Sequence, residues 1–258
     1  MPARGSIIVA VDGKTVRGTI PTGHTRGVHL VAAYLPEKGV VLTHVAVDRK
    51  ENEIVAVPKL LRALDLTGMV VVGDAMQAQR ALSRQVVEAG GDYLWLVKEN
   101  QPTLLADLEL LFERPHLATG WSDPTTDFGT VQRVELGHGR LEERTITVSR
   151  MLRGYVDWPY LDQVFRLERV VTEADKRMVE VRYGITSLPP EVATATRMMA
   201  IARAEWGIEN GLHYRRDVSL AEDACQVRRG HGPQVLAALN NTVVAGMDHR
   251  CWRHSTTP

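Results

Sequence analysis

Several absences narrow the classes open to this 258-residue chain before any motif is considered. It contains two cysteines, Cys225 and Cys251, in unlike surroundings, so neither a disulfide framework nor a cysteine metal site is predicted, and a cytoplasmic location fits. No apolar run approaches the roughly 20 residues of a membrane-spanning helix, so no membrane partner is expected. The first apolar run is also too short for a signal peptide. Lysine plus arginine equals aspartate plus glutamate, 31 against 31, so net charge indicates no partner.

The sequence also lacks a loop that would bind a nucleotide. The segment "VDGKTVRG" has neither the spacing of a dinucleotide-binding loop nor that of a P-loop. An unrelated small-molecule α/β enzyme would need such a loop, so that class is disfavoured. No internal repeat or low-complexity tract stands out. The remaining class is a soluble globular protein, because 44% hydrophobic residues are enough for a substantial core.

Apolar runs and turn residues predict a mixed α/β fold with helices packed on a sheet. A buried strand is expected at 7–11, ending at Asp12 and Gly13. Further strands are expected at 28–36, 39–48, 68–75 and 92–100, and helices at 53–66, 79–91 and 101–113. The first three strands are joined by short loops, which suggests an antiparallel meander. The strand–helix units after them predict the mixed sheet.

The pattern of apolar and charged residues divides the chain into three parts. Residues 1–113 carry the strands and helices just described. From 114 to 187 apolar and charged residues alternate, which is typical of antiparallel strands with one solvated face. Residues 188–258 return to helical periodicity, with helices expected from Val192 to about Tyr214 and from about Pro233 to Met247.

The segment "AEWGIENGLHYRRD" in the last part has an unusual composition for a helix. Trp206, Glu209, His213 and Arg216 follow one another at steps of three, four and three, which places them on one helical stripe. An ordinary core stripe would be apolar, and an ordinary solvent-facing stripe would not need tryptophan. The stripe therefore suggests a functional face.

Two aspartates are candidates for metal chemistry. Asp12 and Asp74 each follow a strand predicted to be buried, and neighbouring strand ends would bring them together. A buried carboxylate is costly unless it is paired or binds a cation, and two together repel one another. Each could instead cap the turn that follows it. With Glu209 from the helix, three carboxylates could hold two Mg²⁺ ions about 4 Å apart, as in phosphoryl transfer.

Five blocks of sequence, in this order, resemble the DDE transposases of bacterial insertion sequences, in the ISAs-type subgroup that includes H-repeat-associated proteins. The blocks are "VAVDGKTVRG", "VVGDAMQAQ", "GDYLWLVKENQPTL", "HGRLEER" and "WGIENGLHYRRDVSLAEDA". The resemblance covers nearly the whole chain. It implies a ribonuclease-H-like core in 1–113 and 188–258, interrupted by a β-rich insertion at 114–187 before the helix that carries the catalytic glutamate.

The resemblance also implies the site and the partners. The acidic triad falls on Asp12, Asp74 and Glu209, which would hold two Mg²⁺ ions, with Mn²⁺ as a substitute. The DNA partner would be double-stranded element ends and target, bound by a homodimer on paired ends. The residues expected to contact DNA are Lys14, Arg17, Lys98, Asn100, Gln101, His138, Arg140 and Arg216. Arg216 stands seven positions after Glu209, where related transposases carry a base.

Structural roles compete with several of these assignments. Lys14 and Arg17 could lie in a solvated loop, and Asn100 or Gln101 could cap the following helix. The turn that contains His138 could serve only to connect two strands of a hairpin. Trp206 favours core packing over base stacking, while His213 fits either a role beside Glu209 or a structural one. Glu205, Asp217, Glu222 and Asp223 are rival carboxylates, and for Glu222 and Asp223 local pairing with the later Arg228 and Arg229 is the ordinary account.

The sequence thus predicts a metal-dependent transposase that cleaves DNA and transfers the freed 3′-hydroxyl end to a second strand. A second hypothesis is a truncated remnant that binds DNA without catalysis. It is motivated by the abrupt start, since full-length family members are expected to carry roughly a hundred further N-terminal residues. It is also motivated by the block at 74–79, where Asp74, Ala75, Met76, Gln77, Ala78 and Gln79 lack the family's usual histidine.

Overall fold

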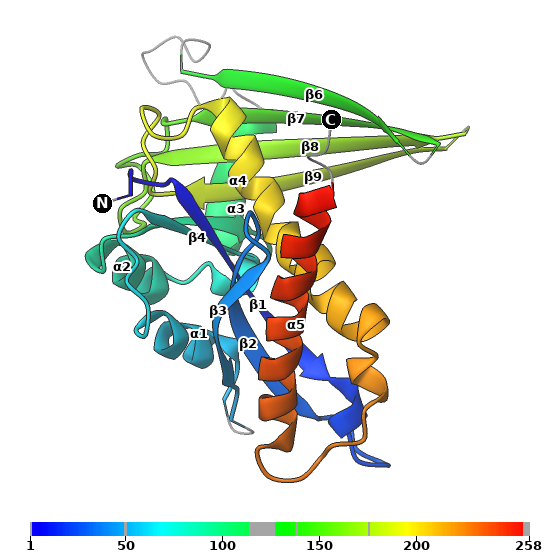
Figure 1. Ribbon diagram of the computed structural model, residues 1–258. Helices are drawn as coiled ribbons and strands as arrows, with labels where there is room; N and C mark the ends of the chain where they lie inside the picture. The colour runs from blue at the N-terminus through cyan, green and yellow to red at the C-terminus, as the bar shows by residue number, and fades with distance from the viewer. Residues whose placement is uncertain (1, 49–50, 114–126, 138, 175, 255–258) are drawn as a thin grey trace.

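The computed structural model describes residues 2–48, 51–113, 127–137, 139–174 and 176–254 (Figure 1). The strands are β1 (Ile7–Val16), β2 (Val28–Leu35), β3 (Val40–Ala46), β4 (Met69–Gly73), β5 (Asp92–Val97), β6 (Gly129–Gly137), β7 (Arg140–Ser149), β8 (Gln163–Glu173) and β9 (Lys176–Thr186). The α-helices are α1 (Glu53–Leu61), α2 (Arg80–Glu88), α3 (Pro102–Glu113), α4 (Ala195–Ile208) and α5 (Gly232–His254). Within these ranges no helix is both long and apolar enough to cross a membrane.

The strands form one nine-stranded sheet in the order β3-β2-β1-β4-β5-β9-β8-β7-β6. β1 pairs antiparallel with β2, as β2 does with β3, and it pairs parallel with β4, which pairs parallel with β5. From β5 the sheet continues through antiparallel β9, β8, β7 and β6. The antiparallel meander followed by parallel strands is the ribonuclease-H-like arrangement, so the predicted α/β fold class is confirmed.

Helices cover both faces of the central strands, and each face has its own apolar core. Along β1, Val9 packs in the core beneath α1, α2 and α3, whereas Ile8 packs in the core beneath α4 and α5 (Figure 1). This division follows from the alternation of side chains along a strand. β4 is covered on both faces, and Val70, Val71 and Val72 are each fully buried. Such two-sided burial requires the continuous apolar run seen in the sequence.

Strands β6 to β9 extend the same sheet through the pairing of β9 with β5. They account for the alternation of apolar and charged residues in the predicted insertion. Their far ends project beyond the helical layers (Figure 1). Near the helices, Ile146 and Phe165 are buried under α4, while further out Leu136 is 82% exposed. The alternating pattern therefore reflects a sheet whose inner end packs against helices and whose outer end is solvated.

Several predicted element boundaries are wrong, and two of these differences bear on the candidate site. β1 does not end at Asp12 but continues to Val16, because it keeps pairing with β2, down to Val16 opposite Val28, after β4 has ended. The helix expected up to Tyr214 is α-helical only to Ile208. Two π-helical turns, Glu209–His213 and Arg215–Ser219, continue it beyond the predicted end. Both differences change how the candidate side chains are presented.

Candidate active site

The parallel pairing of β1 with β4 brings two aspartates to adjacent positions. Val11 and Gly73 are the last paired residues, so Asp12 and Asp74 are the next residues along neighbouring strands. Asp12 lies within β1, and Asp74 follows the end of β4. Strand register alone therefore places the two carboxylates at the same edge of the parallel part of the sheet.

The third candidate, Glu209, lies at the junction between α4 and the first π-helical turn. The helix packs on β1 through Ile208, which is 1% exposed and shares a core with Ile8 and Ala10. Glu209 itself is exposed. Its negative charge contributes to a raised pKa at Asp12, which indicates that the two carboxylates lie within electrostatic range.

The two aspartates lie among uncompensated like charges. Burial raises the pKa of Asp12 to about 7, although a hydrogen bond from the Gly13 backbone N–H lowers it. The charges of Glu53, Asp74 and Glu209 raise this pKa further. Burial and the charge of Glu53 raise the pKa of Asp74, although the backbone N–H of Met76 donates to Asp74 Oδ1 over 3.0 Å. The predicted capping role of Asp74 is thus present as well and does not exclude a second role.

The donor set fits a hard divalent cation in kind. Carboxylate oxygens are the ligands that Mg²⁺ prefers, and mutual repulsion of this sort is relieved by a bound cation. Among the described residues, however, no group of three histidine, cysteine, aspartate or glutamate side chains converges closely enough to hold an ion as it stands. Binding would therefore require side-chain rotation, for which the exposed Glu209 has room.

His213 touches the site directly. Its Nδ1 lies 3.4 Å from Asp12 Oδ2, and its Nε2 is buried without a hydrogen-bond partner among the described residues. Burial, with the nearby charges of Arg216 and Lys14, lowers the pKa of His213 to about 3. The imidazole is therefore neutral at neutral pH, and its contact with Asp12 is not an ion pair.

Two further carboxylates face this region. Glu53 begins α1, and its charge raises the pKa of both aspartates. Sequence reasoning missed it, because a glutamate in the first turn of a predicted helix fits ordinary stabilisation of the helix dipole. Glu205, treated there as a rival carboxylate, lies on α4 with its Oε2 3.6 Å from Arg182 Nη1. Burial raises its pKa to about 7 in spite of that arginine, with smaller contributions from Glu209 and Asp74.

Two of the predicted DNA contacts are inside the protein. Arg216 is 1% exposed and lies 2.7 Å from Glu222 Oε2, and its guanidinium donates to both oxygens of that carboxylate. Lys14 is 7% exposed, and its Nζ lies 2.5 Å from Asp217 and 3.1 Å from Asp223. As placed, neither side chain offers a free donor to a phosphate, so the structure corrects both assignments to internal ion pairs. The burial arises because the chain after Ser219 folds back over β1.

The other predicted contacts are more accessible. Arg17 is 79% exposed, with Nε 3.8 Å from Asp223, and Lys98 is exposed beyond the end of β5. Arg140 is 44% exposed near the start of β7. Asn100 and Gln101 donate through their side-chain amides to the carbonyls of Ala75 and Ala78. They therefore brace the segment after Asp74. His138 lies outside the described residues.

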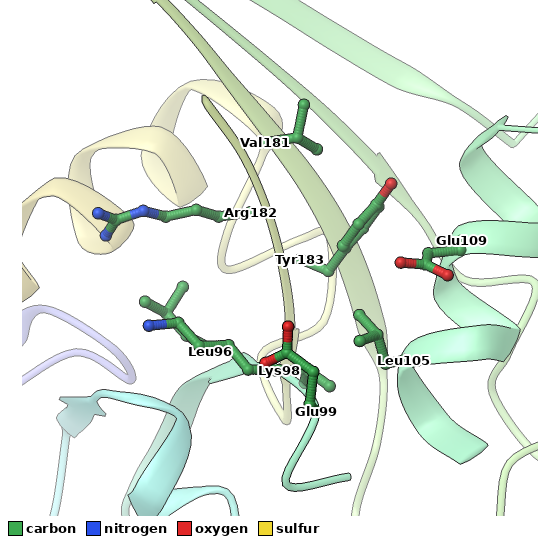
Figure 2. Close-up of a pocket in the computed structure, with 9 residues that line it drawn as sticks. Leu96, Lys98, Glu99, Leu105, Glu109, Val181, Arg182 and Tyr183 are labelled. Atoms are coloured by element: carbon green, nitrogen blue, oxygen red, sulfur yellow. The ribbon is translucent and has the colours of Figure 1, made fainter. Parts of the chain in front are cut away.

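A cavity of about 140 Å³ lies between the end of β5, α3 and β9. Figure 2 shows Tyr183 and Glu109 on one side of β9, while Lys98 and Arg182 extend toward the opposite side. The Arg182 guanidinium lies 4.3 Å from the ring centre of Trp206 on α4. Trp206 is accordingly held by a cation–π contact and is not part of either large apolar core. Arg182 is thus an additional cation near the carboxylates that the sequence did not single out.

Comparison with known proteins is consistent with this arrangement of residues. Residues 3–244 match the family described as "Transposase DDE domain". The chain is 34% identical over 242 residues to "Putative transposase YncI" of Escherichia coli O157:H7, which covers 90% of this chain and 59% of that protein. It is 30% identical over 246 residues to "H repeat-associated putative transposase YhhI" of Escherichia coli K12, covering 92% of this chain and 63% of that protein.

The chain spans about three fifths of the length of these curated relatives. Among solved structures, the piggyBac transposase synaptic complex with hairpin DNA aligns with 95% of this chain and 48% of that chain, at 9% identity and a TM-score of 0.46. The resemblance predicted from the five sequence blocks is confirmed by the family match. Because that match covers most of the chain, this protein belongs to the family of transposase DDE domains.

Proposed function

We propose that this chain is the catalytic part of an insertion-sequence transposase that cleaves DNA and transfers the cut strand. The observation that supports this most directly is the register of β1 and β4, which sets Asp12 beside Asp74 while α4 ends at Glu209. Neighbouring carboxylates raise the pKa of Asp12, and such a set of acidic oxygens suits a divalent cation and not a covalent nucleophile.

Asp12, Asp74 and Glu209 would hold Mg²⁺, or Mn²⁺ in its place, as two ions. When bound, two such ions activate the attacking oxygen and stabilise the leaving oxygen of a phosphodiester. Cleavage adds water across the P–O3′ bond and leaves a 3′-hydroxyl. That hydroxyl would then attack a second phosphodiester and displace its 3′-oxygen.

The other side chains around the site would orient these groups and bind the DNA backbone. His213, neutral and 3.4 Å from Asp12, would fix the orientation of that carboxylate. The exposed cations Arg17 and Lys98 would contact phosphates beside the scissile bond. Arg140, at the far end of the insertion, would reach DNA further from the site, and a homodimer would hold paired element ends.

Nicking of supercoiled plasmid DNA in Mg²⁺ or Mn²⁺ tests this function. Wild type is expected to nick, while Asp12→Asn, Asp74→Asn and Glu209→Gln lose cleavage with their folds retained. Glu88→Gln, an exposed carboxylate at the end of α2, is the matched control and should cleave as wild type does. Undiminished cleavage by Asp12→Asn or Glu209→Gln would overturn the assignment. DNA binding without cleavage by wild type would favour the DNA-binding remnant.

A further inference from the structure

Glu53 occupies a position that the proposed triad does not explain. It is the first residue of α1 and reaches the backbone of β1 next to Asp12. A Cβ atom at residue 13 would overlap both Glu53 Oε1 and His29 Nε2, so the carboxylate fits there only because residue 13 is glycine. Glu53 thus lies against the strand that carries the first catalytic aspartate.

Neighbouring side chains fix the orientation of this carboxylate. His29 Nε2 lies 2.8 Å from Glu53 Oε1, and His29 Nδ1 lies 2.8 Å from Thr15 Oγ1. The Glu53 side chain is 15% exposed. One oxygen is therefore engaged by a histidine that is itself held on β2 by a residue of β1. The second oxygen, Oε2, is left on the side of Gln77.

Gln77 supplies an independent indication that something is bound there. This residue is 1% exposed, and its Nε2 lies 3.4 Å from Glu53 Oε2, at the long limit of a hydrogen bond. Its amide oxygen Oε1 is buried and has no hydrogen-bond partner among the described residues. A buried acceptor without a donor destabilises the folded state. Beside a carboxylate, such an oxygen is suited to a hard cation or to the water that a cation carries.

The electrostatics support the same location. Of the neighbouring carboxylates whose charge raises the pKa of Asp12, Glu53 has the largest effect, ahead of Asp74 and Glu209. Glu53 is likewise the charge that raises the pKa of Asp74. Its carboxylate therefore lies within electrostatic range of both aspartates.

We propose that Glu53 is a fourth carboxylate of the divalent-cation site, oriented by His29 and accompanied by the amide oxygen of Gln77. This rests on the proposed function, because the cation is the one that Asp12 and Asp74 would hold. A purely structural Glu53 would stabilise the start of α1 and pair with His29 without affecting cation affinity. The two roles differ in a measurement of metal binding.

The test is titration of the full chain with Mn²⁺ alone, following free Mn²⁺ by electron paramagnetic resonance. Glu53→Gln is expected to weaken binding by at least about tenfold, since even partners outside the first coordination sphere change metal affinity by 10–100-fold. His29→Gln should weaken it less. Glu51→Gln is the matched control: it lies two residues away and pairs with Lys59 at 2.7 Å. It should bind Mn²⁺ as wild type does.

The outcomes separate the two proposals. If Asp12→Asn and Asp74→Asn lose Mn²⁺ while Glu53→Gln binds as wild type does, Glu53 is structural and this inference fails alone. If neither aspartate variant changes binding, the proposed cation site itself is wrong. Thermal unfolding checks that Glu53→Gln folds. If it does not, Gln77→Met decides the question: weaker Mn²⁺ binding supports the site, whereas unchanged binding with raised stability overturns it.

Discussion

Two clusters of charged side chains meet at β1, through Asp12 and Lys14, and they differ in how their charges are balanced. In the carboxylate cluster, which comprises Asp12, Glu53, Asp74 and Glu209, the charges of the other three raise the pKa of Asp12, and the charge of Glu53 raises that of Asp74. In the ion-pair cluster, formed by Lys14, Arg216, Asp217, Glu222 and Asp223, each cation contacts acidic partners at 2.5–3.1 Å. The first arrangement costs free energy and suits a ligand, whereas the second stabilises the fold.

The contrast explains why Arg216 is not a DNA contact although its spacing from Glu209 matches the family's base. Glu222 is 1% exposed and receives hydrogen bonds from Arg216 and from Asn240 of α5. An ion pair and hydrogen bonds therefore hold the segment after the π-helical turns against the rest of the protein. A buried pair of this kind is costly to break, because the remaining charge loses its partner.

Removal of the arginine should have the largest effect. Arg216→Ala leaves the buried Glu222 without its cation and is expected to lower the free energy of unfolding by about 3–5 kcal/mol. Urea unfolding at pH 7 measures this. Arg84→Ala, an exposed arginine on α2, is the control and should remain within about 0.5 kcal/mol of wild type. Equal stability of the two variants would remove the distinction between the clusters.

Lys14 should give a smaller effect of the same kind. Lys14→Met breaks contacts with Asp217 and Asp223, which are 33% and 25% exposed and can regain water. A loss of about 1–2 kcal/mol is expected, less than for Arg216 because solvent screens these partners. If unfolding is unchanged but DNA affinity falls, Lys14 contacts phosphate after all, and its assignment to the ion-pair cluster is wrong.

The carboxylate cluster should make the protein less stable as the pH rises. Because the folded pKa of Asp12 is raised to about 7, its protonated form stabilises the native state below the unfolded value. That stability is lost as pH rises through about 7. In EDTA, the contribution of Asp12 to the stability of wild type should therefore fall by on the order of 1–2 kcal/mol between pH 5 and pH 8, allowing for partial exposure, and the difference between wild type and Asp12→Asn isolates it. Asp12→Asn should lose less. Identical pH profiles from thermal unfolding would contradict the repulsion.

The smallest effect is expected at the exposed margin of the ion-pair cluster, where Arg17 Nε lies 3.8 Å from Asp223. Arg17 is 79% exposed, so Arg17→Ala should leave the free energy of unfolding within about 0.5 kcal/mol of wild type. If Arg17 contacts a phosphate, the slope of log affinity for DNA against log salt should decrease in magnitude by about 1. Fluorescence anisotropy with a DNA duplex at several salt concentrations measures the slope. An unchanged slope would remove Arg17 from the DNA contacts.

The sequence by itself determined the class of fold and the family. The apolar runs of β4 and β5 required helices on both faces, and the alternation in β6 to β9 required a solvated face. The five ordered blocks identified the DDE family. The nominated triad also followed from sequence, since an aspartate after a buried strand is visible as local chemistry. Its catalytic role stays a prediction.

Only the tertiary structure decided which charges are paired. Arg216 and Arg17 look alike in sequence, but one is buried against Glu222 and the other faces solvent. Glu53 reads as an ordinary first-turn residue until α1 brings it against Gly13 and Asp12. The physical reason is that sequence spacing fixes which side chains share a local face. Compensation of a charge depends on residues far away along the chain, such as Lys14 and Asp223, which are 209 positions apart.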